Sequence, residues 1–152
     1  MAARLYVMVG IPGCGKTTYA RRYLGHALRV SLDDLRLMMT GRAYDERAEP
    51  MVVVAAHALL AALLARANAW RQDVLLDATN ATHDVRQGYV RLARSHQVSP
   101  VAVYVECDLA TALARDAARS DAVGGEVVRR FHSRLRPPTL AEGFDEVISV
   151  ET

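Results

Sequence analysis

Lysine, cysteine and aromatic residues are all scarce in this chain of 152 residues. The two cysteines, Cys14 and Cys107, are too few for a disulfide framework and form no metal-binding spacing, which suits a reducing cytoplasm. The five histidines show no metal-ligand spacing either. Aromatic residues make up 6% of the chain and form no evident ladder for stacking bases. We therefore expect a cytoplasmic protein whose chemistry does not rest on cysteine or histidine clusters.

The net charge and the apolar runs exclude fewer classes of protein than the scarce residues do. Nineteen basic and 17 acidic residues give a formal net charge of +2, which neither requires nor excludes nucleic acid, because a nearly neutral protein can carry a basic groove. The most apolar stretch, 51–65, is shorter than the ~20 residues that span a bilayer. It predicts a buried helix over about 49–70. Residues 1–4 lack the apolar core of a signal peptide, so we expect no membrane association.

The clearest motif follows the first apolar run. Leu5–Val9 predicts a buried strand, Gly10–Thr17 matches G-x-x-x-x-G-K-[ST], and Thr18–Leu24 predicts a helix. Glycines let such a loop turn tightly, so that its N–H groups form a nest for phosphate oxygens at the start of a helix. Lys16, the only lysine, would reach the β- and γ-phosphates, and the Thr17 hydroxyl would bind Mg²⁺. The expected nucleotide-binding residues here are Gly13, Cys14, Gly15, Lys16, Thr17 and Thr18, with ATP as donor.

Strands and helices alternate along the rest of the chain, which predicts a single α/β domain over 1–152 with a parallel sheet and helices on both faces. We expect about five strands, the last at the sheet edge: 5–9, 27–31, 74–77, 101–106 and 144–150. We expect helices near 16–24, 33–40, 49–70, 84–97, 109–119 and 125–135. Ligands of such sheets bind beyond the carboxyl ends of the strands.

Two acidic residues and an arginine follow the second expected strand. Asp33 or Asp34 could accept the proton of an acceptor hydroxyl, and Asp33 is our candidate for the base. Arg36 lies three residues on, on the same helical face, where it could clamp an acceptor phosphate. The alternatives are a helix cap for the aspartates, with Ser31 as a further capping residue, and a solvated surface arginine.

Asp77 ends an apolar strand, the arrangement in which an acid holds Mg²⁺ or a water bound to it. Thr79 and Asn80 follow and could hydrogen-bond the acceptor. A plain turn at the end of the strand would also use these residues.

Arg115 and Arg119 are four residues apart in an expected helix that ends before Gly124. An arginine-bearing lid would neutralise triphosphate charge as it closes. The alternative is a charged helix face in which Asp116 and Asp121 pair with the arginines.

Taken together, these motifs resemble the polynucleotide 5′-kinase domain of phage and bacterial nucleic-acid end-healing enzymes, over roughly 5–148. The resemblance implies that Asp33 is the general base for a 5′-hydroxyl and that Arg36 contacts the adjacent phosphate. It also implies that Arg115 and Arg119 engage the nucleotide phosphates. Some members place the third-strand acid one position nearer the Thr-Asn pair than Asp77, which leaves its role between metal shell and scaffold. Members are often fused to a phosphatase, ligase or other end-processing domain. Two alternatives therefore stay open: a kinase that stands alone, with a phosphatase or ligase as partner on another chain, or a module of a longer chain.

Three functions remain open from the residues. The resemblance favours an ATP-dependent kinase of DNA or RNA 5′-hydroxyl ends. Zeta-toxin-like and other small P-loop kinases share the motifs loosely and phosphorylate small molecules, and the fold alone does not choose the acceptor. A regulatory module that binds ATP and hydrolyses it slowly is the third.

Overall fold

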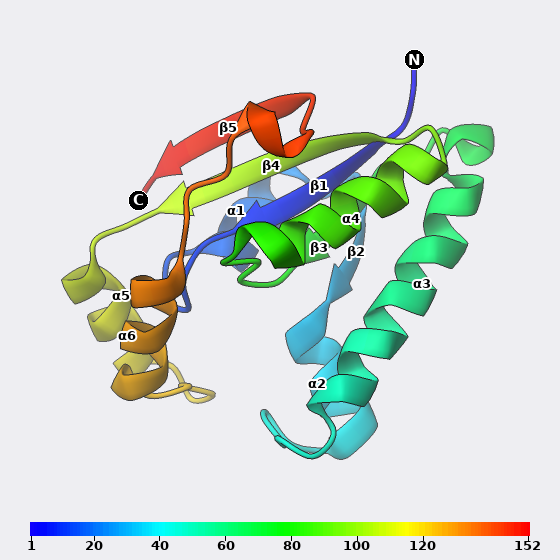
Figure 1. The fold of residues 1–152 in the computed structure, drawn as a ribbon. Helices are drawn as coiled ribbons and strands as arrows, with labels where there is room; N and C mark the ends of the chain where they lie inside the picture. The colour runs from blue at the N-terminus through cyan, green and yellow to red at the C-terminus, as the bar shows by residue number, and fades with distance from the viewer.

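The computed structural model describes residues 1–152 and contains one parallel sheet with helices on both faces (Figure 1). Its strands are β1 (Arg4–Val9), β2 (Leu28–Ser31), β3 (Val74–Asp77), β4 (Ser99–Glu106) and β5 (Glu146–Glu151). They lie in the order β2-β3-β1-β4-β5, and every neighbouring pair is parallel. The predicted five-stranded α/β sheet is confirmed, with β5 at an edge.

The helices start and end within two residues of their predicted bounds. They are α1 (Lys16–Tyr23), α2 (Leu32–Thr40), α3 (Glu49–Trp70), α4 (His83–Ser95), α5 (Leu109–Ala117) and α6 (Gly125–Arg134). A short 3₁₀ turn, η1 (Leu140–Glu142), was not predicted. It depends on a capping box in which the side chains of Thr139 and Glu142 bind each other's backbone, a signal confined to four residues.

The sheet is buried on both faces, as a parallel sheet with crossover helices must be. Successive side chains of a strand point to opposite faces. In β1, Leu5, Val7 and Val9 therefore pack with residues of α3 and α4, whereas Tyr6 and Met8 pack with residues of α1, α5 and α6. Two apolar cores result, one for each face, and the carboxyl ends of the strands are left to carry polar side chains.

Helix α3 has its predicted bounds, but the expectation that it is buried is wrong. It covers β2 and β3 and packs against α2, so a single stripe faces the core. That stripe has near-four-residue spacing: Val52, Ala56, Leu60, Leu64 and Ala67. The remaining surface, with Met51, Val54 and Trp70, is exposed. By length and composition α3 could cross a membrane, a test that core helices of globular proteins also pass.

Candidate active site at the carboxyl ends of the strands

The loop between β1 and α1 has the shape of a phosphate nest. Gly13 and Gly15 have φ of +85° and +95°, a left-handed conformation that side chains strain. A Cβ on Gly13 would also collide with the backbone carbonyl of Ala112 on α5. Gly15 is the N-cap of α1, so the free N–H groups and positive end of that helix face the loop.

Lys16 and Thr17 occupy the first turn of α1. The Lys16 Nζ lies 3.0 Å from the carbonyl oxygen of Ile11, on the opposite side of its own loop. The Thr17 Oγ1 donates to the Oδ2 of Asp77 over 3.0 Å. Asp77 reaches it because β3 neighbours β1, which brings the carboxyl end of β3 beside the loop. With its proton on Asp77, the Thr17 hydroxyl keeps its lone pairs for a cation. The structure thus brings the two predicted metal ligands together.

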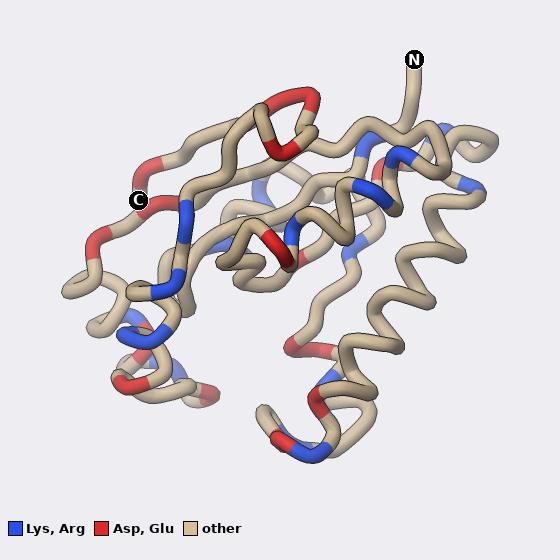
Figure 2. The backbone as a smooth tube through the Cα atoms, viewed as in Figure 1, with Lys and Arg blue, Asp and Glu red and all other residues tan.

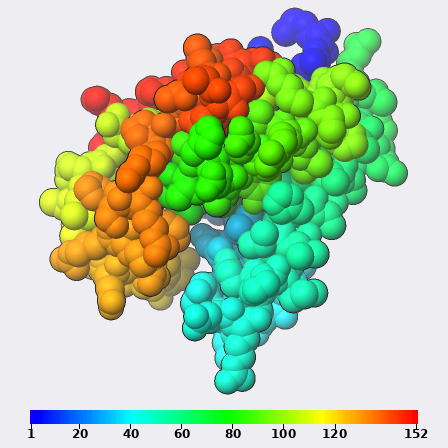
Figure 3. Space-filling view, viewed as in Figure 1, coloured from blue at the N-terminus to red at the C-terminus, as the bar shows by residue number.

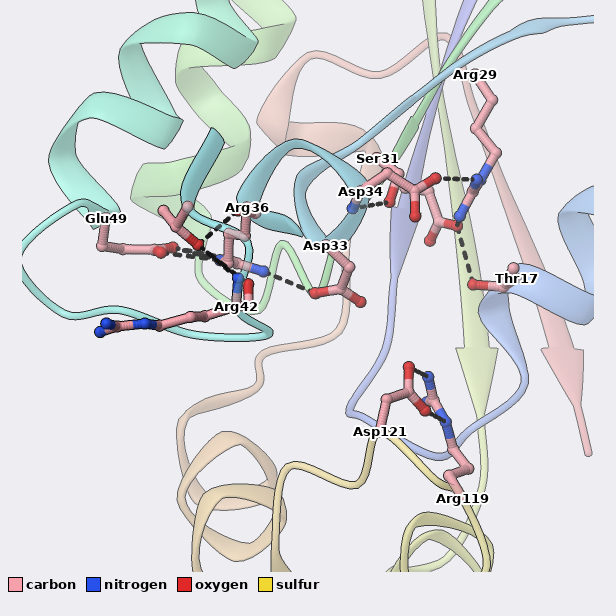
Figure 4. Close-up of polar contacts among 12 residues, drawn as sticks. Thr17, Arg29, Ser31, Asp33, Asp34, Arg36, Arg42, Glu49, Arg119 and Asp121 are labelled. Carbon is pink, nitrogen blue, oxygen red and sulfur yellow. Dashed lines mark hydrogen bonds and ion pairs between the residues drawn. The ribbon is translucent and has the colours of Figure 1, made fainter. Parts of the chain in front are cut away.

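A third residue at this point, Arg29, was not among the candidates. Its Nε and Nη2 both lie 2.9 Å from the Oδ2 of Asp77, and its Nη1 lies 2.8 Å from the Oδ2 of Asp34 (Figure 4). Burial lowers the pKa of Arg29, but its bonds to Asp77 and Asp34 outweigh this, and the pKa is raised. The available signal was a lone charge inside the four-residue strand β2, two positions before Ser31.

The two neighbouring aspartates of α2 have separate partners. Ser31 is the N-cap, and its Oγ accepts the backbone N–H of Asp34 at 3.2 Å. Asp34 turns its carboxylate to Arg29, while Asp33 binds the Nη1 of Arg36 through Oδ1 at 2.7 Å. The Asp33 side chain is 78% exposed, and no hydrogen bond to its Oδ2 is present. Capping thus belongs to Ser31, and Asp33 presents a free carboxylate oxygen to the solvent.

Arg36 is not a solvated surface arginine. Its Nε and Nη2 approach the carboxylate of Glu49, at 2.8 Å and 2.6 Å respectively. Glu49 lies in the first turn of α3, and the two side chains are 25% or less exposed. The hydrogen bond to Glu49 raises the pKa of Arg36 despite the opposing effect of burial. Sequence reasoning missed Glu49, because 13 residues and an irregular loop separate it from Arg36.

Asn80 faces inward rather than toward an acceptor, whereas Thr79 is half-buried and is held through its backbone. The Thr79 carbonyl accepts the N–H of Gly10 at 3.1 Å. Asn80 is buried at φ +44°, and its Nδ2 donates to the carbonyl of Met8 over 2.7 Å. A buried carbonyl at the end of β1 needs a donor, and Asn80 supplies it. The expectation that the Asn80 side chain hydrogen-bonds an acceptor is therefore not what the structure shows.

Of the two predicted lid arginines, only Arg115 reaches the phosphate loop. Its Nη1 lies 3.4 Å from the carbonyl oxygen of Cys14 and 3.1 Å from the Oγ1 of Thr152. Arg119 instead pairs with Asp121 at 3.1 Å, and both side chains are exposed. Figure 4 shows this pair across an opening from Asp33.

The expected shared helix face of Arg115 and Arg119 is wrong, because α5 ends at Ala117. The cause is Asp116, which is buried and accepts the N–H groups of Val123 and Gly124 at 3.0 Å each. These bonds fold the chain back after the helix. Asp116 is therefore not the partner of either arginine.

An open cavity of about 470 Å³ lies beside the loop. Its walls include Thr18, Tyr19 and Tyr23 of α1, Arg115 of α5, and Thr152. The rings of Tyr19 and Tyr23 are 4.8 Å apart and form an aromatic wall. A cavity of this size and composition has room for a nucleotide base next to the phosphate nest.

A second recess opens between α6 and the segment from α2 to the start of α3 (Figure 3). Charged residues of both signs are carried along its two sides, on α2 with the following loop and on the segment from α5 to α6 (Figure 2). Asp33, Arg36 and Glu49 lie on the α2 side, so an acceptor entering here meets a mixture of charges.

Comparisons with known proteins agree with this geometry. A family model described as "AAA domain" (AAA_33) matches residues 5–138, whereas no curated protein sequence matches significantly. A chain of a Pnkp1/Rnl/Hen1 complex aligns with a TM-score of 0.64 and 26% identity over 75% of this chain and 39% of its own length. A protein of Chloroflexus aurantiacus, whose kinase assignment is provisional, gives a TM-score of 0.74 at 16% identity over 100% of this chain and 89% of that one.

A third solved structure holds nucleotides. The APS kinase CysC of Mycobacterium tuberculosis, in complex with AMPPNP and APS, gives a TM-score of 0.66 at 18% identity over 97% of this chain and 88% of that one. The present chain thus spans about two fifths of the chain from the Pnkp1 complex but most of the other two. Its fold is that of P-loop kinases, with a site that fits ATP, and by the extent of the family match the chain belongs to the AAA_33 family of P-loop domains.

Proposed function

We propose that this P-loop kinase transfers the γ-phosphate of ATP to the 5′-hydroxyl end of a DNA or RNA strand. The observation that carries the proposal is the placement of Asp33. Its carboxylate is exposed at the start of α2, and Arg36 binds one of its oxygens. The next residue, Asp34, is linked through Arg29 to Asp77 beside the phosphate loop. An acceptor hydroxyl at Asp33 would face the transferable phosphate across the opening of Figure 4.

Each step follows from groups in place. The Oδ2 of Asp33 accepts the proton of the 5′-hydroxyl, whose oxygen attacks the γ-phosphorus. The bond from that phosphorus to the bridging oxygen breaks, and ADP leaves. Lys16 and Arg115 stabilise the transferring charge from the loop side. Arg119 joins them once it exchanges Asp121 for phosphate.

Magnesium fits the donors that are present. No group of three or more His, Cys, Asp or Glu side chains could hold a metal ion by itself. Thr17 and Asp77 supply a hydroxyl and a carboxylate, the oxygen ligands that Mg²⁺ prefers, and the triphosphate would complete the shell. When bound, Mg²⁺ neutralises charge on the β- and γ-phosphates.

The nucleic-acid acceptor is supported by the motif resemblance and by the 26% identity with the chain from the Pnkp1/Rnl/Hen1 complex. In this proposal Arg36 contacts the phosphate next to the acceptor nucleoside, which requires it to exchange Glu49 for that phosphate. This chain spans 39% of the chain from the Pnkp1/Rnl/Hen1 complex. We therefore include in the proposal a phosphatase or ligase that completes the repair reaction.

A small-molecule acceptor is the second candidate, and the Arg36–Glu49 pair favours it. A carboxylate bound to Arg36 opposes a second anion there, whereas hydroxyl groups can hydrogen-bond both side chains. The structural likeness to an APS kinase supports a small-molecule acceptor only through the shared fold, because APS is itself an anion.

Transfer of γ-labelled phosphate from ATP, with Mg²⁺, to a short 5′-hydroxyl oligonucleotide tests the proposal. We expect the wild type to label the oligonucleotide and Asp34→Ala to label it at a reduced rate. Asp33→Ala should give no labelled oligonucleotide. A nucleoside 3′-monophosphate should be a better acceptor than the bare nucleoside. If the wild type binds ATP but labels neither the oligonucleotide nor the nucleoside 3′-monophosphate, the nucleic-acid acceptor is rejected. Hydrolysis of ATP that Asp33→Ala leaves unchanged would point to a regulatory module.

A further inference from the structure

Arg29 is the one side chain whose contacts run from the phosphate-loop side of the site to helix α2. Two of its nitrogens bind the Oδ2 of Asp77, which also accepts the hydroxyl of Thr17. The third binds the Oδ2 of Asp34. A continuous line of contacts thus connects Thr17 on α1 to the first turn of α2 (Figure 4).

The strand geometry explains why Arg29 reaches both carboxylates. In the parallel register of β2 and β3, Ser31 lies beside Asp77 and Arg29 beside Leu75. Side chains two residues apart in a strand share a face, so Arg29 and Asp77 are both on the α1 face of the sheet. Asp34 comes within reach because the Ser31 cap turns α2 back over the end of β2.

The chemistry of the guanidinium suits this bridge. Its planar fork presents donors in fixed directions, so one group can bind two carboxylates that lie on different elements. Asp77 is buried, and Arg29 supplies positive charge beside it. All hydrogen bonds to the Asp77 carboxylate converge on Oδ2, and none is made to Oδ1. Arg29 and Thr17 therefore fix the orientation of this carboxylate and leave its second oxygen for a cation or its water shell.

We propose that Arg29 is a positioning residue that couples the cation site at Thr17 and Asp77 to the helix turn that carries Asp33. It orients Asp77 for Mg²⁺, and through Asp34 it sets the position of the neighbouring base relative to the γ-phosphate. The coupling to turnover rests on the kinase activity proposed above, whereas the effect on cation binding does not depend on the acceptor.

The test compares Arg29→Gln, Arg29→Lys and Asp34→Asn with Arg66→Gln, an exposed arginine whose guanidinium contacts only its own helix. The first readout is the affinity for Mn²⁺ in the presence of a non-hydrolysable ATP analogue. We expect Arg29→Gln to weaken Mn²⁺ binding by about 10-fold or more, the usual cost of losing an outer-shell partner. Asp34→Asn and Arg66→Gln should stay within about twofold of the wild type, since neither touches Asp77.

The second readout is kcat and KM for phosphoryl transfer. Arg29→Gln and Asp34→Asn should each lower kcat, Arg29→Gln by about 10- to 100-fold, with smaller changes in the KM for ATP. The double variant should be no slower than Arg29→Gln alone, because both changes cut the same bridge. Arg29→Lys should recover Mn²⁺ affinity more than kcat, since an ammonium cannot span both carboxylates.

Several results would overturn the proposal. One is a folded Arg29→Gln variant with wild-type Mn²⁺ affinity and kcat, and another is a double variant in which the two losses multiply. If Arg29→Gln does not fold, wild-type kcat in Asp34→Asn would overturn it equally. If the wild type phosphorylates no acceptor, the proposed function fails alone, and the Mn²⁺ comparison still decides whether Arg29 orients Asp77.

Discussion

The donor side of the site is formed by the backbone, whereas the acceptor side is formed by charged side chains. On the donor side, the nest consists of backbone N–H groups fixed by Gly13, Gly15 and the start of α1. On the acceptor side, a set of ion pairs between side chains of α2 and α3 holds Asp33 and Arg36. Backbone geometry tolerates few alternatives, whereas ion pairs between partly exposed side chains exchange partners at less cost.

This difference separates binding from selection. A nest of N–H groups and a helix terminus bind any triphosphate in one pose. The acceptor side can change its substrate by altering a side chain such as Glu49, without moving the loop. Substitutions on the donor side should therefore abolish transfer to every acceptor. On the acceptor side only loss of the base Asp33 should do so, whereas changes such as those at Glu49 should redirect or tune activity.

Lys16→Ala should break the donor side most severely. Removing the charge that meets the β- and γ-phosphates should lower kcat for transfer by about 10²–10³-fold or more, the cost of losing a transition-state donor. Arg66→Ala, an exposed arginine of α3, serves as the control. Retention of more than a tenth of the wild-type rate by Lys16→Ala would contradict a phosphate-binding role.

The same site offers a chemical test, because Lys16 is the only lysine in the chain. An amine-reactive reagent can label only Lys16 and the N-terminal amine. ATP with Mg²⁺ should protect Lys16 while leaving the N-terminus reactive, as measured by peptide mass spectrometry. Equal labelling of Lys16 with and without ATP would place the nucleotide elsewhere.

Asp33→Asn should have an effect on kcat of similar size. Loss of a general base lowers kcat by about 10²–10⁴-fold, and ATP affinity should be unchanged because Asp33 is on the far side of the opening. Asp34→Asn is the matched comparison, since it breaks the bridge to Arg29 but keeps the carboxylate of Asp33, so its kcat should fall less. If Asp34→Asn proved the more damaging of the two, the assignment of the base would move to Asp34.

Glu142→Gln should affect stability instead of selectivity. Glu142 binds the Nε of Arg86 at 2.7 Å with both side chains 4% exposed or less, and Arg86 also holds the carbonyl of Asn80 behind the loop. Leaving Arg86 buried without its partner should lower the free energy of unfolding by about 3–5 kcal/mol in urea denaturation. Glu49→Gln breaks the matched, more exposed pair with Arg36 and should cost about 1 kcal/mol or less.

The same pair predicts a pH dependence. Burial alone would raise the pKa of Glu142, but Arg86 and the N–H of Thr139 outweigh it, so the pKa lies below the ordinary 4.5. A carboxyl with a lowered folded-state pKa stabilises the fold above its ordinary pKa, and this contribution is lost as the pH falls through the folded-state value. Wild-type stability should therefore fall more steeply below pH 4.5 than that of Glu142→Gln. Parallel curves would contradict the pairing.

How far the sequence predicted the molecule follows the same division. The sheet, its edge strand and the loop were predictable, because each depends on a contiguous pattern of a strand, glycines and a helix. Thr17 and Asp77 were each predicted to bind the cation, and their side chains do meet, since parallel strands end at one edge of the sheet.

What sequence could not supply was the pairing of distant side chains. Arg29 meets Asp77 across 48 positions, and Glu49 meets Arg36 across an irregular loop. Asn80 was predicted to bind the acceptor, but its side-chain amide donates to the carbonyl of Met8 instead, because a buried carbonyl needs a donor. Arg119 lost its helical position because Asp116 folds the chain back, which local helix propensity does not reveal.

Glu49→Gln should produce the smallest change and the sharpest distinction. If Arg36 exchanges Glu49 for an acceptor phosphate, removing the competing charge should lower the KM for a nucleoside 3′-monophosphate by about two- to fivefold, the worth of a partly exposed ion pair. The KM for the bare nucleoside, which has no phosphate to gain, should not change. If Arg36 serves only to hold Asp33, the substitution should instead shift kcat for both acceptors alike. The ratio of the two KM values therefore decides whether the acceptor side reads a phosphate or merely supports the base.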